Sequence, residues 1–332
     1  MDISEIGKFE LIKRLTANIK PAQPSTLKGI GDDAAILHYG NTAIAVSTDS
    51  LMEGVNFDLT YTPLQHLGYK AATVGFSNLY AMNAMPRQLL VSIAVSAKFS
   101  VEALERLYQG IKLACERHRV DLVGGDATPS VTGLAITVTA IGEAEPEKIT
   151  YRNTAQKGDL ICVSGSLGGA YMGLKVLERE KKLFNEDPTI QPQLDAYSYV
   201  AGRHLKPEAR SDIFAFFASA GLKPTSMIDV SDGLSSNLLH ICAASDVGCE
   251  IHHHKIPIAD ETITAAEEFY LEPIITALNG GDDYELLFTT PVADYDKIIG
   301  YENISIIGYI KDKEEGCNLV TEGGTMIEIK GY

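Results

Sequence analysis

Aspartates stand beside glycine or hydroxyl-bearing residues at four separate places in the sequence. They occur at residues 29–34 (GIGDDA), 47–49 (STD), 124–126 (GGD) and 229–233 (DVSDG). Each group comes where an apolar, strand-like run ends, and α/β proteins bind ligands in the loops that follow their strands. Carboxylate and hydroxyl oxygens are ligands that Mg²⁺ prefers, and Mg²⁺ commonly bridges carboxylates to phosphates. The pattern predicts one metal–phosphate site assembled from four distant segments.

The first group also has the G-x-G-x-x-A spacing of a dinucleotide-binding loop. Such a loop binds a pyrophosphate through bare backbone amides. Here Asp32 and Asp33 would repel a pyrophosphate by on the order of several kcal/mol unless metals intervened. A single aspartate in a loop is most often a helix cap or turn former, and Asp229 could simply end a strand. The metal–phosphate interpretation therefore depends on the four groups together.

Composition limits the classes of partner. The chain has 332 residues, 45% of them hydrophobic, and a formal net charge of −16 from 28 basic and 44 acidic residues. This length favours two globular domains. The negative charge argues against a nucleic-acid partner, because a phosphate backbone is bound by a basic face. For the same reason an anionic substrate requires divalent cations or a few well-placed basic groups.

The N-terminal sequence and the cysteine spacing both favour an intracellular protein. The N-terminal residues show no basic segment followed by an apolar one, and no apolar run reaches membrane-spanning length, so we expect a cytoplasmic protein without a membrane partner. The cysteines are odd in number, widely separated and without a C-x-x-C pair: Cys115, Cys162, Cys242, Cys249 and Cys317. This spacing favours reduced thiols over a zinc site or disulfide framework.

Helical and strand-like segments alternate along the whole chain, which predicts an α/β (α+β) fold. The clearest helices are expected at residues 2–19, 65–84, 101–118, 208–220 and 234–244, and the clearest strands at 42–47, 88–96, 120–123, 133–141, 225–228 and 284–289. Residues 143–148 (EAEPEK) are polar, contain a proline and have no periodicity. We therefore place a domain boundary there, giving domains of residues 1–145 and 146–332.

A glycine-rich turn at residues 165–169 (GSLGG) precedes an expected helix. Two interpretations are open. The turn could present backbone amides to an anion at the helix N-terminus, or its glycines could allow close packing of helix against strand.

The motifs in their order along the chain resemble those of thiamine-monophosphate kinases, which belong to the ATP-binding superfamily of aminoimidazole ribonucleotide synthetase. The resemblance covers nearly the whole chain. It is carried by residues 7–12, 29–34, 47–54, 70–72, 81–82, 124–126, Arg152, 228–233, 280–286 and 307–309.

The resemblance implies a two-domain fold with an N-terminal ATP- and metal-binding domain and a mixed sheet. It also implies direct phosphorylation of thiamine monophosphate to thiamine diphosphate by ATP with several Mg²⁺ ions, in a homodimer. The implied metal ligands are Asp33, Ser47, Thr48, Asp49, Asn78, Asp126, Asp229 and Asp232. The implied ATP contacts are Gly125, Asp126, Arg152 and Ser231, and the implied substrate contacts are Asn56, Asp282 and Tyr332.

Four positions depart from the family pattern. Asn56 stands where the family usually has histidine, and an asparagine cannot carry charge to the substrate phosphate. Asn78 stands where an aspartate usually bridges several metals, so the site has one negative charge fewer. Ala127 replaces a threonine, and Asp282 replaces a glutamate.

These departures keep two alternatives open beside the kinase. One is another ATP-dependent enzyme of the superfamily with a different phosphorylated acceptor, because Asn56 and Asp282 both fall on the acceptor side. The other is a nucleotide-binding module that has lost turnover, because Asn78 weakens the metal set.

Overall fold

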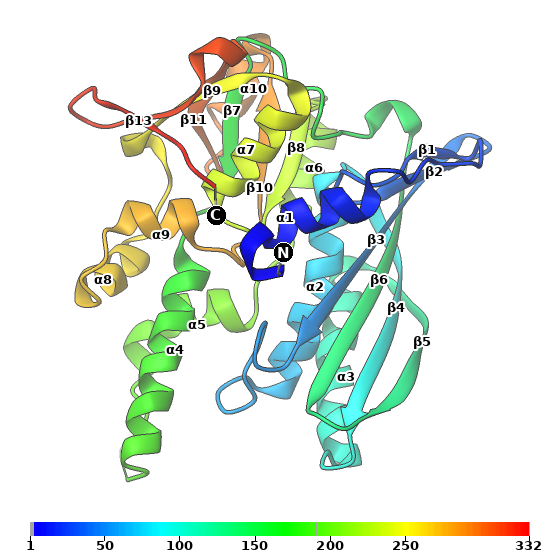
Figure 1. Ribbon diagram of the computed structural model, residues 1–332, viewed down its shortest axis with the longest axis vertical. Helices are drawn as coiled ribbons and strands as arrows, with labels where there is room; N and C mark the ends of the chain where they lie inside the picture. The colour runs from blue at the N-terminus through cyan, green and yellow to red at the C-terminus, as the bar shows by residue number, and fades with distance from the viewer. Residues whose placement is uncertain (1–2, 190, 332) are drawn as a thin grey trace.

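Two β-sheets follow one another along the chain, in a computed structural model that describes residues 3–189 and 191–331 (Figure 1). The first sheet has the strand order β1-β2-β3-β6-β4-β5, with β5 parallel to β4 and the other pairs antiparallel. Its strands are β1 Thr26–Lys28, β2 Ala35–Tyr39, β3 Thr42–Met52, β4 Met85–Ser96, β5 Asp121–Ser130 and β6 Leu134–Ala144.

The second sheet has the order β13-β12-β9-β11-β7-β10-β8, with β12 parallel to β9 and the other pairs antiparallel. Its strands are β7 Leu160–Ser164, β8 Ser226–Val230, β9 Gly248–His252, β10 Glu285–Thr290, β11 Ile304–Lys311, β12 Cys317–Val320 and β13 Met326–Glu328. Every residue of β8 and β10 is buried. The expected mixed α/β architecture is therefore confirmed.

Two helices cover one face of the first sheet: α2 (Leu64–Ala81) packs on the strands and α3 (Val101–His118) packs on α2. Helix α2 is buried on nearly all sides because it lies between the sheet and α3. The two helices approach closely at Gly68, where a Cβ atom would lie 1.9 Å from the carbonyl oxygen of Leu107. Ser100 caps α3, since its Oγ accepts a hydrogen bond from the amide of Ala103 at 3.2 Å.

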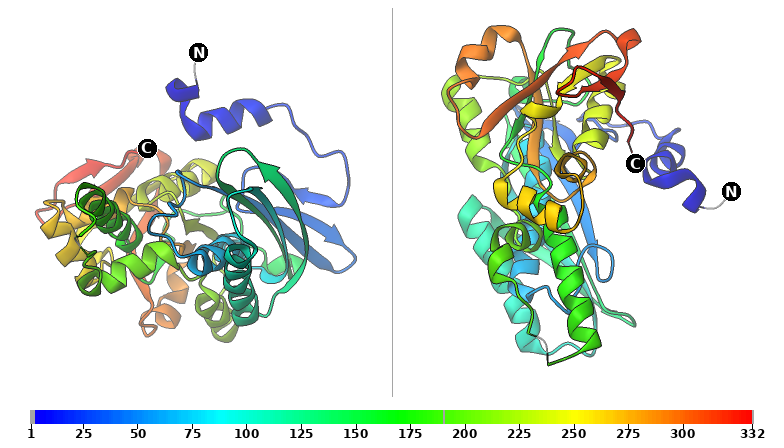
Figure 2. Two further views of the ribbon diagram at one scale, coloured as in Figure 1. Left: turned by 90° about the horizontal axis from the view of Figure 1, so that it is seen from below. Right: turned by 90° about the vertical axis from the view of Figure 1, so that its left-hand side faces the viewer.

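The remaining helices belong to the second half, apart from α1 (Ile3–Thr16), which stands away from the body of the molecule (Figure 2). They are α4 Gly169–Glu186, α5 Ser198–Leu205, α6 Ser211–Ala220, α7 Leu234–Ser245, α8 Asp260–Glu268, α9 Pro273–Asn279 and α10 Tyr295–Ile298. Helix α7 packs on β8 and β10, whereas α4, α5 and α8 pack on one another around a small core of their own. One hydrophobic core joins the two halves, since Phe76 of α2 belongs to the same buried cluster as Phe217 of α6 and Phe288 of β10. The two halves therefore meet along α2.

Several expected boundaries were wrong. Strand β3 continues to Met52 because its pairing with β6 extends that far, so residues 47–49 lie inside a strand. Strand β5 likewise runs on through residues 124–126, which pair with β4. The expected helix at 208–220 begins only at Ser211, and α5 before it was not predicted.

Among the described helices, none is long and apolar enough to cross a membrane.

Candidate active site

Aspartates from both halves converge where α2 meets the second sheet. Asp229, near the end of β8, is 2% exposed, and its carboxylate accepts hydrogen bonds from Ser77 Oγ at 2.8 Å and Ser231 Oγ at 3.1 Å. Asp49 of β3 accepts a hydrogen bond from Asn78 Nδ2 at 2.6 Å. Because Ser77 and Asn78 are adjacent on α2, this helix turn connects an acid of the first half to an acid of the second half.

Electrostatic interaction within this group is strong. Burial, together with the negative charges of Asp33 and Asp49, raises the pKa of Asp229 to about 7 from an ordinary value of 3.8. Burial also raises the pKa of Asp33, against the opposing effect of Arg152. Asp33 and Asp49 both disfavour the charge of Asp229, so a cation bound beside Asp229 would stabilise the charged carboxylate.

Arg152 supplies one countercharge from inside the group. Its guanidinium binds both carboxylate oxygens of Asp33, with Nε at 3.1 Å from Oδ2, and its backbone amide donates to Asp32 at 2.9 Å. Its carbonyl oxygen accepts hydrogen bonds from Ser226 Oγ at 2.8 Å and Ser245 Oγ at 2.9 Å. These bonds hold the residue between the 29–34 loop and the second sheet.

A cavity of about 200 Å³ opens beside the acids. Its wall includes Asp229, Asp282 and five further residues that were predicted from the sequence as site residues. Those five are Asp49, Asn56, Asn78, Ser231 and Asp232. A second cavity of about 330 Å³ shares Asn56 and Asp282 with the first, and its wall also includes Tyr61 and Lys181. Asn56 and Asp282 thus stand at the junction of the two cavities.

An ion pair between the two halves lies at this junction. Lys70 of α2 is almost fully buried, and its Nζ lies 2.8 Å from Asp282 Oδ2. Burial favours the neutral acid, but the charge and hydrogen bond of Lys70, together with His204 and Tyr284, outweigh burial and hold the pKa of Asp282 below its ordinary value. The loop of Asp282 also pairs with the 229–233 loop, since the amides of Asp282 and Tyr284 donate to Ser231 and Val230.

The Asp282 loop has an unusual backbone conformation that a buried network supports. Asp282 and Tyr284 have positive φ angles of 64° and 52°, which disfavour residues with a Cβ atom. Between them, Asp283 accepts the amides of Gly168 at 2.7 Å and Ala170 at 3.2 Å. The glycine-rich turn at 165–169 therefore presents its amides to a carboxylate of the protein itself.

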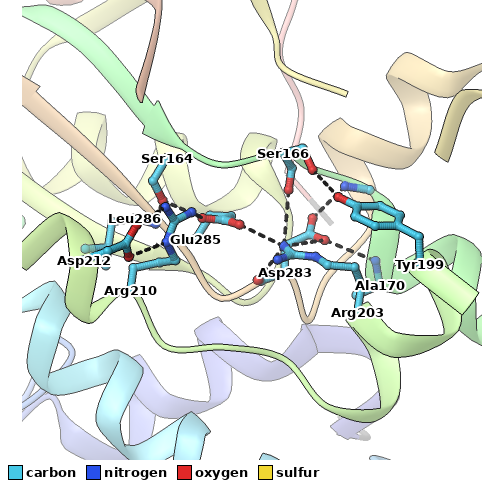
Figure 3. A network of polar contacts seen from close by, with 11 residues as sticks. Ser164, Ser166, Ala170, Tyr199, Arg203, Arg210, Asp212, Asp283, Glu285 and Leu286 are labelled. Atoms are coloured by element: carbon cyan, nitrogen blue, oxygen red, sulfur yellow. Dashed lines mark hydrogen bonds and ion pairs between the residues drawn. The ribbon is translucent and has the colours of Figure 1, made fainter. Parts of the chain in front are cut away.

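Two arginines complete this network (Figure 3). Arg203 Nη2 donates to the carbonyl oxygen of Asp283 at 3.0 Å and to Glu285 Oε1 at 3.0 Å. Glu285 is 1% exposed and also binds Arg210 and Ser164 Oγ. Both ends of the strained loop are thus anchored to buried charges.

Known proteins resemble this chain over its full length. The family model "AIR synthase related protein, N-terminal domain" matches residues 31–144. The thiamine-monophosphate kinase of Aquifex aeolicus is 32% identical over 335 residues, covering 100% of this chain and 99% of the relative. That of Bacillus subtilis is 33% identical over 337 residues, covering 98% of this chain and 99% of the relative.

This chain belongs to the thiamine-monophosphate kinase family. Among solved structures, AaThiL complexed with AMPPCP and TMP matches with a TM-score of 0.85 and 30% identity, covering 100% of this chain and 98% of that one. The hydrogenase maturation protein HypE in complex with ATP matches with a TM-score of 0.70 at 19% identity, which shows a shared fold. The chain is accordingly a kinase, and the family predicted from its motifs is confirmed.

Not every residue assigned from the family pattern lies in the acid group. Ser47 shares the α2-facing side of β3 with Asp49, but Thr48 points to the opposite side and donates to the carbonyl oxygen of Val138 at 3.1 Å. Gly125 lies within β5, where a Cβ atom would meet the carbonyl oxygen of Val91 at 1.7 Å. Tyr332 lies outside the described residues.

Asp126 is separated from the other acids within one chain. It lies on exposed β5 and pairs with Ser92, which pairs with Thr137, which in turn pairs with Ser50. These four residues share the face of the sheet opposite to Asp49. Three strand spacings separate β5 from β3, a distance of about 14 Å.

Lys70, Ser77 and Tyr284 all line or support the site, although the sequence motifs assign no role to them. Lys70 had a recognisable signal, since it is a single lysine in an otherwise largely apolar helix. A buried lysine requires a partner of opposite charge. Ser77 and Tyr284 carried no such signal.

We expect the free energy of unfolding of the metal-free protein to fall as pH rises from about 4 to about 7. In this window the unfolded chain has lost the Asp229 proton, whereas the folded chain retains it because the folded pKa is raised to about 7. One such group contributes a slope of up to about 1.4 kcal/mol per pH unit. Urea unfolding in EDTA should show a shallower slope for Asp229→Asn, and identical slopes would contradict the electrostatic account.

Arg203→Met should destabilise the protein by about 2 to 4 kcal/mol, because it leaves Glu285 with one buried partner fewer. Arg87→Met is the matched control, since its ion pair with Glu143 is 46% and 42% exposed. Removing such an exposed pair should cost less than about 1 kcal/mol. Equal losses of unfolding free energy in the two variants would show that the network does not stabilise the loop.

Proposed function

We propose that this protein transfers the terminal phosphate of ATP directly and in line to the phosphate of thiamine monophosphate, forming thiamine diphosphate. The observation that carries the proposal is a pair of neighbouring cavities that share Asn56 and Asp282 in their walls, the first of them also lined by Asp49, Asp229 and Asp232. Two phosphate-bearing substrates could meet at that junction. Phosphoryl transfer between them requires mainly positioning and neutralisation of charge.

The donor set fits Mg²⁺. Asp33 and Asp49 are half-buried carboxylates that interact electrostatically with the buried Asp229. Asp49, Asn78, Asp229 and Asp232 line one cavity. When bound, Mg²⁺ would neutralise the phosphates and the carboxylates together. The raised pKa of Asp229 in the ion-free protein supports this role, because that carboxylate is held at a position where its charge lacks compensation.

The second cavity suits the organic part of the acceptor. Asn56 Oδ1 accepts the amide of Met52 at 2.9 Å, so its NH₂ group is the part that can donate to a phosphate. Lys70 adds a positive charge on the same side, where its ion pair with Asp282 holds it in place. These two groups would orient the acceptor phosphate, while Tyr61 offers an aromatic wall to the thiamine rings.

A homodimer would resolve the isolated position of Asp126. Strand β5 is exposed along nearly its whole length and carries exposed Leu122 and Val123 at the edge of the first sheet. An edge strand of this kind is usually covered by another element. We therefore place β5 at the interface between two copies, so that Asp126 of one copy completes the acid group of the other.

Incubation with ATP, Mg²⁺ and thiamine monophosphate tests the activity. We expect thiamine diphosphate and ADP in equal amounts, dependent on Mg²⁺, with no diphosphate from unphosphorylated thiamine. Release of ADP with a different phosphorylated acceptor, but not with thiamine monophosphate, would assign another substrate. Absence of any transfer despite ATP binding would leave only a nucleotide-binding module.

Mixing two inactive variants tests the position of Asp126. Asp49→Ala and Asp126→Ala should each lower turnover by about 100-fold or more, since each removes a charge that neutralises the reacting phosphates. If Asp126 acts across the interface, a mixed dimer has one intact site, formed by Asp49 of one chain and Asp126 of the other. When equal amounts of the two variants are dissociated and reassembled at random, half of the dimers are mixed. The mixture should therefore recover about a quarter of wild-type activity.

Asp121→Ala, on the same exposed strand, is the control and should retain activity alone. If the mixture stays as inactive as its components although mixed dimers have formed, Asp126 does not act across the interface.

A further inference from the structure

Three cysteines, one of them distant in the sequence from the other two, converge in the second half of the protein. Cys249 of β9 and Cys317 of β12 lie directly opposite each other in the parallel pairing of these strands. Cys242 lies in the last turn of α7, which packs over the sheet. The three sulfur atoms all lie within 4.8 Å of one another. The spacing predicted reduced thiols, and the cysteines are free thiols in the structure, but the convergence of these three could not be read from the spacing.

The surroundings of the three thiols are apolar. Cys249 is fully buried, Cys242 is 3% exposed, and Cys317 is half-buried at the side from which solvent can approach. The same buried cluster contains Ile251, Leu319 and other aliphatic side chains of the second sheet. Across the described residues, no histidine, aspartate or glutamate joins this group as a further ligand.

The sulfur geometry matches coordination of a single ion. Thiolate sulfurs bind Zn²⁺ at about 2.3 Å, which places two sulfurs on one ion about 4 Å apart. Separations within 4.8 Å therefore require only small side-chain adjustments. Two of the ligands are fixed by strand pairing and the third by a helix, so the site is largely preformed.

We propose that Cys242, Cys249 and Cys317 form a binding site for a thiophilic divalent cation of the Zn²⁺ class. This site is separate from the acid group and belongs to the second sheet. Binding replaces three thiol protons with the ion, and the fourth coordination position, on the Cys317 side, is open to water.

Charge favours a divalent over a monovalent ion. Three thiolates with a divalent ion carry a net charge of −1, whereas three thiolates with Cu⁺ carry −2. The more negative assembly is harder to bury among aliphatic side chains. A hard ion such as Mg²⁺ does not compete for this site, because it prefers oxygen ligands.

The ion would join segments that the fold otherwise holds only by packing and strand pairing. Helix α7 starts directly after the 229–233 loop and ends at Ser245, which binds the Arg152 carbonyl oxygen. An ion at Cys242 would fix the end of this helix to β9 and β12. We therefore expect bound ion to raise the melting temperature of the protein, with no requirement for either substrate.

Titration of the fully reduced, metal-free chain with Cd²⁺ tests the proposal, because Cd²⁺–thiolate bonds give an ultraviolet charge-transfer band that carboxylate ligands do not. We expect one equivalent to produce the band, to release protons and to be displaced by Zn²⁺ in competition. Cys317→Ser and Cys242→Ser should each weaken binding by at least about tenfold. Added Cd²⁺ should raise the melting temperature by a few degrees in those proteins that show the charge-transfer band, and should leave it unchanged in variants that do not.

Cys115→Ser is the matched control, since Cys115 is also a nearly buried helix residue but lies in the first half. It should bind Cd²⁺ like the wild type. Because Cys317 is partly exposed, its serine variant tests the site even if Cys242→Ser does not fold. Absence of the band in the wild type, or an equally strong band in Cys317→Ser, would overturn the proposal.

Discussion

The repulsion that neighbouring carboxylates exert on the buried Asp229 is the constraint on which this site depends. Asp33, Asp49 and Asp229 come from different segments and are held close enough to raise the pKa of Asp229 to about 7, although Arg152 binds Asp33. A fold that needed only stability would place apolar residues or paired charges at such a position. The excess negative charge is understandable if cations and phosphates complete the site.

The rest of the fold positions this group from two sides. Helix α2 carries Lys70, Ser77 and Asn78 on one surface, and each binds an acid of the site. The second sheet supplies Asp229 from the end of β8 and Asp282 from the loop before β10, and the backbone of this loop pairs with Val230 and Ser231. The buried pairs of Arg203 and Glu285 then hold the Asp282 loop in its disfavoured backbone conformation.

The sequence was sufficient for the family, the α/β class and most acids of the site, because these depend on local motifs and hydrophobic periodicity. It was not sufficient for features that depend on pairing between distant strands. The length of β3, the face of Thr48 and the separation of Asp126 from Asp49 all follow from register with β6 and β4. The convergence of Cys249 and Cys317 likewise follows from the pairing of β9 with β12.

Counting bound divalent ions tests the central claim most directly. Equilibrium dialysis with Mn²⁺ in place of Mg²⁺ and a non-hydrolysable ATP analogue should give at least two ions per chain in the wild type, because one ion cannot neutralise both the carboxylates and the triphosphate. Asp229→Asn should retain fewer ions while remaining folded. Binding of one ion or none, or an ion count unchanged in the Asp229→Asn variant, would contradict the account.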